Sequence, residues 1–271
     1  QRQMCIRDRS GETADSLAAL RLAKKKGVKT LGIVNVVGSS IAREADSVMY
    51  TWAGPEIAVA TTKAYSAQLA ALYLLTMKLG RVRGTISDEL FASLLEDIKK
   101  LPYQIELLLG QKEKIQRFAN RYVGAKDIFF IGRGIDYAIS LEGSLKLKEI
   151  SYVHSEAYAA GELKHGTISL IDEDVPVIAV ATQTGIIPKT ISNVVEVKSR
   201  GAKVILVCTD ACARELKDGV ADYVIEIPHT DELLMPITAV VPLQILAYYT
   251  SINRGIDPDK PKNLAKSVTV E

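Results

Sequence analysis

The sequence has few cysteines and no excess of either charge, and both shortages exclude whole classes of protein. Three cysteines among 271 residues do not make a disulfide framework. Cys208 and Cys212 have no histidine nearby, so they also lack the spacing of a zinc site. The net charge of +2 balances 34 basic against 32 acidic residues, and no basic run is long. This balance argues against nucleic acid or a membrane surface as the partner.

Long apolar runs are missing as well. We find no run of about 18 apolar residues that would span a bilayer. The start, QRQMCIRDR, lacks the apolar segment of a secretion signal. We therefore expect a cytoplasmic protein with a small molecule as its partner. The hydrophobic content of 48% is enough for one large core or two of ordinary size.

Two stretches of the chain repeat the same pattern. Residues 24–34 and 197–207 both indicate a helix end, a glycine, a basic residue and a buried strand. Each is followed by a polar loop, a helix, and a strand introduced by Ala-Asp, at Asp46 and Asp222. Strands that alternate with helices form parallel sheets with helices on their faces. The predicted fold is therefore α/β, with two copies of one unit.

The first copy begins abruptly. The motif Ser10-Gly11-Glu12-Thr13 is typical of a helix start, and it predicts a helix over 14–26. No strand is expected before it, because the first nine residues are charged and unpatterned. We expect the chain to divide into 1–9, a non-native segment; 10–80, a partial first domain; 81–116, a helical connector interrupted by Pro102; 117–255, a second domain; and 256–271, a tail that closes the active site.

The segment 141–166 is dense in groups that can transfer protons. On a helix, Glu142, Lys146 and Glu149 would share one face. Charge pattern alone favours a solvated face with ion pairs. Before it, an apolar strand at 127–131 leads through a glycine turn at 132–134 into this helix, an order that can present N–H groups to an anion. A tight turn explains these glycines equally well.

Several motifs together resemble the SIS (sugar isomerase) domains, and more narrowly the glutamine–fructose-6-phosphate aminotransferases, or glucosamine-6-phosphate synthases. They are SGET at 10–13, AGPEIAVATTKAY at 53–65, Glu149, EAYAAGELKHG at 156–166 and PKNLAKSVTVE at 261–271. The resemblance runs from Ser10 to the last residue. It implies two SIS domains of three α/β/α layers, the first truncated at its N-terminus. The implied reaction makes glucosamine 6-phosphate from fructose 6-phosphate and glutamine-derived ammonia, without metal or organic cofactor.

The resemblance also implies roles for individual residues. Glu149 matches the base that moves a proton between C1 and C2 of the sugar, and Lys146 matches an assisting cation. His165 matches a ring-opening histidine contributed by the neighbouring subunit, which implies a homodimer. Lys266 matches the lysine that forms a Schiff base with the sugar. The residues implied in sugar binding are Ser10, Thr13, Val59, Thr61 and Ala265. His154 and His229 have no implied role, and we expect them to be structural or surface histidines.

The sequence also departs from the family. Nothing in it corresponds to the glutaminase domain of the full enzyme, so we expect no release of ammonia from glutamine. The first SIS strand with its Gly-Thr-Ser loop is not expected, and Asp8-Arg9 replace a Ser-Gln pair, so one charge would repel a phosphate and the other attract it. Two alternatives remain open: a non-catalytic SIS module that senses sugar phosphates, and a SIS-type deglycase or deaminase. The presence of Lys146, Glu149, His165 and Lys266 favours the enzyme over the sensor. The tail at 263–271 argues against the deglycase or deaminase.

Overall fold

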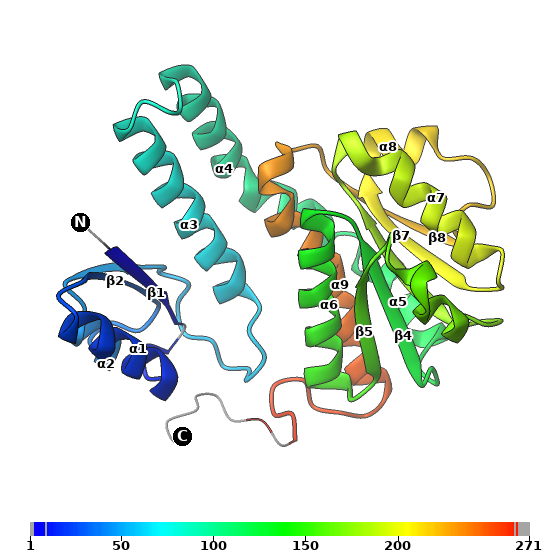
Figure 1. The fold of residues 1–271 in the computed structure, drawn as a ribbon. Coiled ribbons are helices and arrows are strands. Elements are labelled where there is room, and N and C mark those ends of the chain that lie inside the picture. Colours follow the sequence, from blue (N-terminus) through cyan, green and yellow to red (C-terminus); the bar gives the residue numbers. More distant parts are fainter. Residues whose placement is uncertain (1–2, 9, 263, 265–271) are drawn as a thin grey trace. The chain divides into compact units, whose positions relative to one another are not determined.

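The computed structural model describes residues 3–8, 10–262 and 264. They form two compact units (Figure 1). The first comprises the described residues up to Ala92 with Lys262 and Leu264, and the second comprises Ser93–Pro261.

The first unit is built on a three-stranded parallel sheet in the order β1-β2-β3. Its strands are β1 (Gln3–Arg7), β2 (Lys29–Val34) and β3 (Ser47–Tyr50). Its helices are α1 (Ala14–Lys25), α2 (Ser40–Glu44) and α3 (Lys63–Val82), and α4 (Asp88–Leu109) begins here. Leu20, Val34 and Ile41 are fully buried and form the core between α1, α2 and the sheet. Ile33 of β2 is fully buried as well.

The presence of β1 corrects the prediction that the first copy lacks its opening strand. Gln3–Arg7 pairs in parallel with β2, from Gln3 opposite Lys29 to Arg7 opposite Ile33. In the sequence, only Met4-Cys5-Ile6 are apolar, between the polar residues Gln3 and Arg7, and so short a run gives no clear period. The pairing comes from the backbone, because the apolar strand β2 offers an edge on which any extended segment can continue the ladder.

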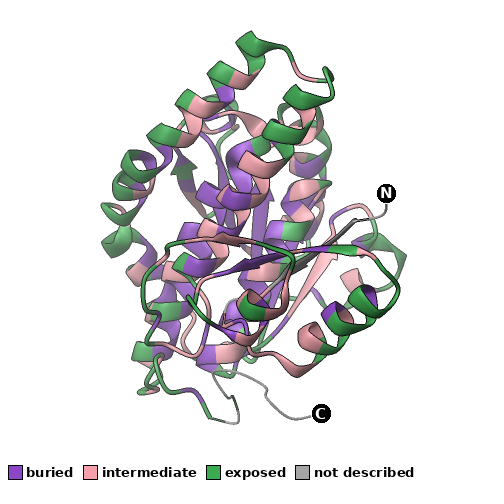
Figure 2. Ribbon diagram, turned by 90° about the vertical axis from the view of Figure 1, so that its left-hand side faces the viewer, coloured by how far each residue is buried: buried purple, intermediate pink, exposed green. Residues whose placement is uncertain are grey.

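The second unit holds a five-stranded parallel sheet in the order β5-β4-β6-β7-β8. Its strands are β4 (Asp127–Gly132), β5 (His154–Ala159), β6 (Pro176–Ala181), β7 (Lys203–Thr209) and β8 (Tyr223–Ile227). Its helices are α5 (Lys112–Arg121), α6 (Ile135–Ser151), α7 (Ile187–Lys198), α8 (Asp210–Glu215) and α9 (Met235–Asn253), with short 3-10 turns η1 (Leu163–His165), η2 (Thr167–Leu170), η3 (Thr184–Ile186) and η4 (Glu232–Leu234). Strand β6 is buried along its whole length, as Figure 2 shows for the middle of the sheet.

The two faces of this sheet are covered by different helices. On one face, Phe129 and Val177 pack with Val194 and Val197 of α7. On the other, a Cβ placed on Gly143 of α6 would touch both Leu243 of α9 and Phe130 of β4, so α6 and α9 meet over that strand. Strands covered on both faces are apolar throughout, which is why β4, β6 and β7 appear in the sequence as unbroken apolar runs. The three-layer α/β/α arrangement predicted for this domain is confirmed.

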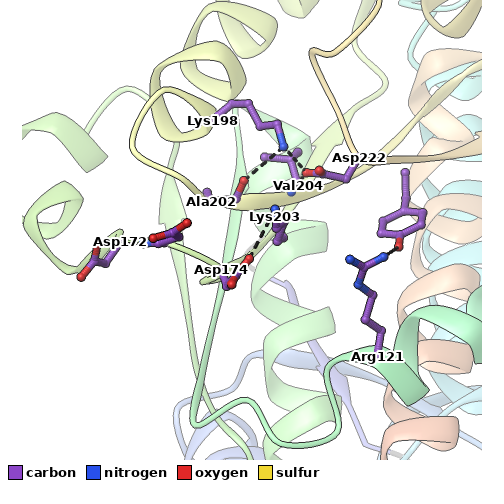
Figure 3. Close-up of polar contacts among 10 residues, drawn as sticks. Arg121, Asp172, Asp174, Lys198, Ala202, Lys203, Val204 and Asp222 are labelled. Atoms are coloured by element: carbon purple, nitrogen blue, oxygen red, sulfur yellow. Dashed lines mark hydrogen bonds and ion pairs between the residues drawn. The ribbon is translucent and has the colours of Figure 1, made fainter.

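Corresponding hydrogen bonds occur in both units. The order strand, helix, strand, helix, strand runs through β1–β3 and again through β6–β8. The aspartate before the third strand accepts from an N–H near the start of the second strand in each case: Asp46 from Thr30 at 2.8 Å, and Asp222 from Val204 at 2.7 Å. These carboxylates therefore tie the amino ends of the strands together, and Figure 3 shows the one in the second unit.

Helix α4 continues through Pro102, so the prediction that this proline interrupts it is wrong. Its residues on either side are anchored: Leu101 is buried, and Gln104 Nε2 donates to the backbone oxygen of His229 at 2.6 Å. Packing and this side-chain hydrogen bond offset the backbone bond that a proline removes.

One helical stretch among the described residues, Glu232–Asn253, is long and apolar enough by length and composition to cross a membrane. Gln244 and several hydroxyl residues interrupt its apolar side chains, so the sequence holds no unbroken apolar run of that length here. Its most apolar window is 78% buried, and core helices of this kind pass the same test.

Candidate functional site

The glycine turn before α6 brings a helix start directly onto the end of β4. Gly132 ends the strand, and a Cβ there would lie 2.5 Å from the backbone carbon and oxygen of Asp136. Gly134, the next glycine, has φ of 55°, a left-handed conformation that favours glycine. The close turn fixes the position of α6, and α6 carries the charged side chains of the site.

Lys146 lies between two carboxylates of α6. Its Nζ is 3.5 Å from Glu142 Oε1 and in direct contact with Glu149 Oε2. The Lys146 side chain is only 5% exposed, and those of Glu142 and Glu149 are 16% and 23% exposed. The solvated-face interpretation is therefore wrong for this lysine. A buried ammonium must be paired, and here it is paired twice, so the group carries one net negative charge if all three are ionised.

Hydrogen bonds hold this part of α6 against its neighbours. Ser144 Oγ and Ser155 Oγ of β5 lie 3.0 Å apart, and Ser155 Oγ also donates to the Ser144 carbonyl at 3.0 Å. Ser251 of α9 donates to the Ile150 carbonyl at 2.8 Å. These bonds flank Lys146 and Glu149, so the two charged side chains project from a rigid backbone.

His165 stands apart from this charged group. It ends the short turn η1 and is exposed, and within the described residues no hydrogen bond or ion pair joins it to Lys146 or Glu149. The other two histidines are exposed as well. His154 Nδ1 lies 2.6 Å from Asp127 Oδ1, and His229 contributes its backbone oxygen to Gln104.

The polar loop of the first unit connects β1 to α1. Ser10 Oγ accepts from the Glu12 N–H at 3.2 Å, and Thr13 precedes the first residue of the helix. Glu12 Oε1 accepts from the Ser40 N–H at 2.8 Å, and hydrogen bonding from Ser40 holds the pKa of Glu12 below its ordinary value. Gly11 has φ of 72°, and a Cβ there would lie 2.1 Å from Ser39 Oγ. The loop at β1 and the turn before α2 therefore pack directly on each other.

Asp8, Glu12 and Ser39 were not among the predicted site residues. Asp8 receives both the N–H and the hydroxyl of Thr13, each at 3.0 Å. The sequence carried a signal for Asp8, since it replaces a residue of the resembled motif, but its hydrogen-bond partner depends on the fold of the loop.

The remaining predicted residues fall in two groups. Val59 and Thr61 are half-buried in the segment between β3 and α3. Ala265 and Lys266 lie outside the described residues. The structure thus brings Glu142, Lys146 and Glu149 together in the second unit, and Ser10, Thr13 and Asp8 together in the first. Among the described residues, no cluster of three histidine, cysteine or acidic side chains could hold a metal ion.

Two parallel sheets with helices on their faces, and polar loops where strands end, define an α/β protein built of doubly wound units. The SIS domain model matches residues 5–78 and 122–254. The C-terminal domain of glucosamine-fructose-6-phosphate aminotransferase from Francisella tularensis is 37% identical, with a TM-score of 0.91 over 94% of this chain and 72% of that one. The chain therefore belongs to the SIS domain family, within its glutamine–fructose-6-phosphate aminotransferase branch.

Two further relatives extend this comparison. The glutamine–fructose-6-phosphate aminotransferase of Caldanaerobacter subterraneus subsp. tengcongensis is 55% identical over 262 residues, which is 97% of this chain and 43% of that protein. The chain thus spans less than half the length of this curated relative. A glucosamine-6-phosphate deaminase from Thermotoga maritima is 28% identical, with a TM-score of 0.74 over 97% of this chain and 74% of that one.

Proposed function

We propose that this chain is the sugar-isomerising part of a glutamine–fructose-6-phosphate aminotransferase. It would make glucosamine 6-phosphate from fructose 6-phosphate and ammonia that a glutaminase domain of the full-length enzyme releases from glutamine. The observation that carries the proposal is the buried Lys146 held between Glu142 and Glu149. A desolvated acid–base group on a rigid helix is unfavourable for stability alone, and proton transfer at carbon requires one.

In the proposed reaction, Glu149 acts as the base. Its carboxylate removes a proton from C1 of the ketose imine that ammonia forms at C2, and returns a proton to C2. The C1 hydroxyl loses its proton and the nitrogen on C2 gains one, which leaves an amine on C2 and an aldehyde at C1. Between these two steps the sugar carries an electron-rich enolamine, and the Lys146 ammonium stabilises the negative charge that develops on its oxygen. Because both side chains are mostly buried, water competes weakly for the proton.

Further parts of the proposal come from the resemblance. Lys266 forms the Schiff base, and Ser10, Thr13, Val59, Thr61 and Ala265 bind the sugar phosphate. His165 opens the sugar ring in the site of a partner subunit, which its exposure allows, so the active form is a homodimer. The two units are internal repeats. The buried free thiols of Cys208 and Cys212 fit a reducing cytoplasm.

The test is to trap the imine. The chain is incubated with fructose 6-phosphate and borohydride. The masses of the intact protein and of its C-terminal peptide are then measured by mass spectrometry. We expect one reduced sugar adduct on Lys266, absent in Lys266→Ala. In Glu149→Gln the adduct should still form, but exchange of the C1 proton with solvent deuterium should fall by about two to four orders of magnitude.

The matched control is Glu96→Gln, because Glu96 forms an exposed i,i+3 pair with Lys99 and has no place in the proposal. It should trap and exchange as the parent does. Absence of an adduct in a chain whose circular dichroism shows a folded protein would contradict the proposal.

A second candidate is a deaminase that runs related chemistry in the opposite direction. It is favoured by the similarity to the Thermotoga maritima glucosamine-6-phosphate deaminase. Incubation with glucosamine 6-phosphate separates the two, since a deaminase releases ammonia and fructose 6-phosphate in each turnover. Rapid ammonia release by the chain would favour the deaminase over the synthase part.

A further inference from the structure

The carboxylate of Asp8 is fixed inside the loop between β1 and α1. The Asp8 N–H donates to the Ile33 carbonyl at 3.1 Å, so the residue extends the backbone ladder of β1 with β2. Its side chain turns to Thr13, where Oδ2 accepts from the N–H and Oδ1 accepts from the hydroxyl, both at 3.0 Å. Both carboxylate oxygens are therefore engaged by a single residue, and the sheet holds the carboxylate in place.

The donors on Thr13 are those that a bound anion would use. Thr13 is the N-cap of the twelve-residue helix α1, where unsatisfied N–H groups and the helix dipole favour negative charge. A second, independent feature lies in the turn before α2, which packs on this loop. Ser39 is 3% exposed, its Oγ has no hydrogen-bond partner among the described residues, and it lies against Gly11. A buried hydroxyl without a partner is costly, and a ligand oxygen at this loop would supply one.

We infer that the Asp8 carboxylate takes the place of the phosphate group of a sugar phosphate in this loop, and that it weakens binding of the dianion while leaving neutral sugars unaffected. The inference rests on the proposed function, because the loop is assigned to the phosphate through it. Two anions cannot share the Thr13 donors, and their like charges repel in this half-buried loop. Asp8 is thus a specificity-determining residue of this chain, and removal of its charge restores phosphate binding.

The same carboxylate–threonine arrangement occurs at a second place in the first unit. Asp46 Oδ2 accepts from the Thr30 N–H at 2.8 Å and from its hydroxyl at 2.7 Å. This pair lies at the amino ends of β2 and β3, whereas Asp8 lies at the carboxyl end of β1. Ligands of parallel α/β sheets bind outside the carboxyl ends of the strands. Asp46 therefore offers a matched control in the same unit, with the same donors and the same charge at the opposite edge.

The experiment measures binding by isothermal titration calorimetry to the full chain and to Asp8→Ser, Asp8→Asn and Asp46→Asn. The probes are fructose 6-phosphate, inorganic phosphate and fructose. We expect both Asp8 variants to bind fructose 6-phosphate about 10- to 100-fold more tightly than the parent, with a parallel gain for inorganic phosphate. Affinity for fructose should stay unchanged in all variants, and Asp46→Asn should match the parent for every probe. Circular dichroism establishes that each variant is folded.

The outcomes separate this inference from the proposed function. If parent and Asp8 variants bind fructose 6-phosphate equally, the role of Asp8 is overturned while the proposed function stands. If the Asp8 variants gain affinity for inorganic phosphate but form no borohydride adduct with fructose 6-phosphate, the proposed function fails while the role of Asp8 stands. If Asp8→Ser does not fold, Asp8→Asn decides, because asparagine keeps the size and one acceptor for Thr13. An unchanged affinity in a folded Asp8→Asn overturns the inference.

Discussion

Asp222 shows how a single carboxylate of this chain balances burial against hydrogen bonding. Its side chain, 23% exposed, accepts from Lys198 Nζ at 2.5 Å and from the Val204 N–H at 2.7 Å (Figure 3). Burial by itself raises the pKa of Asp222, but the hydrogen bonds from Lys198 and Val204 outweigh it and hold the pKa below its ordinary value. The carboxylate is thus stabilised in its charged form by the folded state.

This balance predicts a pH-dependent effect of Asp222→Asn. The pKa of Asp222 is lower in the folded chain than in the unfolded one, so its contribution is present above about pH 4 and is lost as pH falls through the lower folded value. We expect the variant to lose roughly 1 to 2 kcal/mol of unfolding free energy at pH 7, and less near pH 2.5. Urea unfolding across this range measures the difference. Asp218→Asn, at an exposed aspartate nearby, should show little effect. A constant loss at every pH would contradict the prediction.

At the scale of one element, the sequence predicts where helix α6 begins but not which of its charged side chains are buried. The apolar run of β4, the glycines and the spacing of the charged residues predicted the strand, the turn and the helix start at Ile135. They did not predict the burial of Lys146, because a periodic pattern shows which residues share a face but not what covers that face. Strand β5, the next element along the chain, and helix α9, which is distant in sequence, pack against this helix.

The turn into α6 predicts an effect of Gly132→Ala. The new Cβ would lie 2.5 Å from backbone atoms of Asp136, which cannot move aside as a side chain can. We expect a loss of about 2 to 3 kcal/mol in unfolding free energy, because the helix start must shift away from β4. Equilibrium urea unfolding provides the measurement. Gly124→Ala is the control, since nothing lies within 4 Å of its Cβ position. Equal stability of the two variants would show that the close approach is not needed.

Across the whole chain, the sequence predicted an α/β protein with two units, because apolar runs of strand length alternate with helical segments. It missed β1, whose residues gain strand structure by pairing with β2, and it misjudged Pro102, whose neighbours are held by tertiary contacts. Both errors have one cause: local pattern carries no information about partners far along the chain. The contact of Asp8 with Thr13, five residues on, escaped prediction for another reason, because it depends on how the loop between β1 and α1 turns.

The two units should differ in local stability. Among the described residues, the cluster between α1, α2 and the sheet of the first unit centres on Leu20, Val34 and Ile41, whereas β6 and β7 contribute to a larger cluster in the second unit. Opening of β2 therefore exposes less apolar surface than opening of β6 or β7. Amide hydrogen exchange followed by mass spectrometry should show peptides of β2 exchanging at least about tenfold faster than those of β6 and β7. Equal protection would mean that the first unit does not open independently.

Trp52 makes the first unit optically distinguishable from the rest of the chain. It is the only tryptophan in the sequence, it is 76% exposed, and its ring lies 5.6 Å from that of Tyr50 at the end of β3. It also begins the segment that leads to Val59 and Thr61. Red-edge excitation therefore selects one indole, and its emission wavelength and anisotropy report on that segment alone. The unmodified chain thus carries its own fluorescent probe of the segment that follows β3.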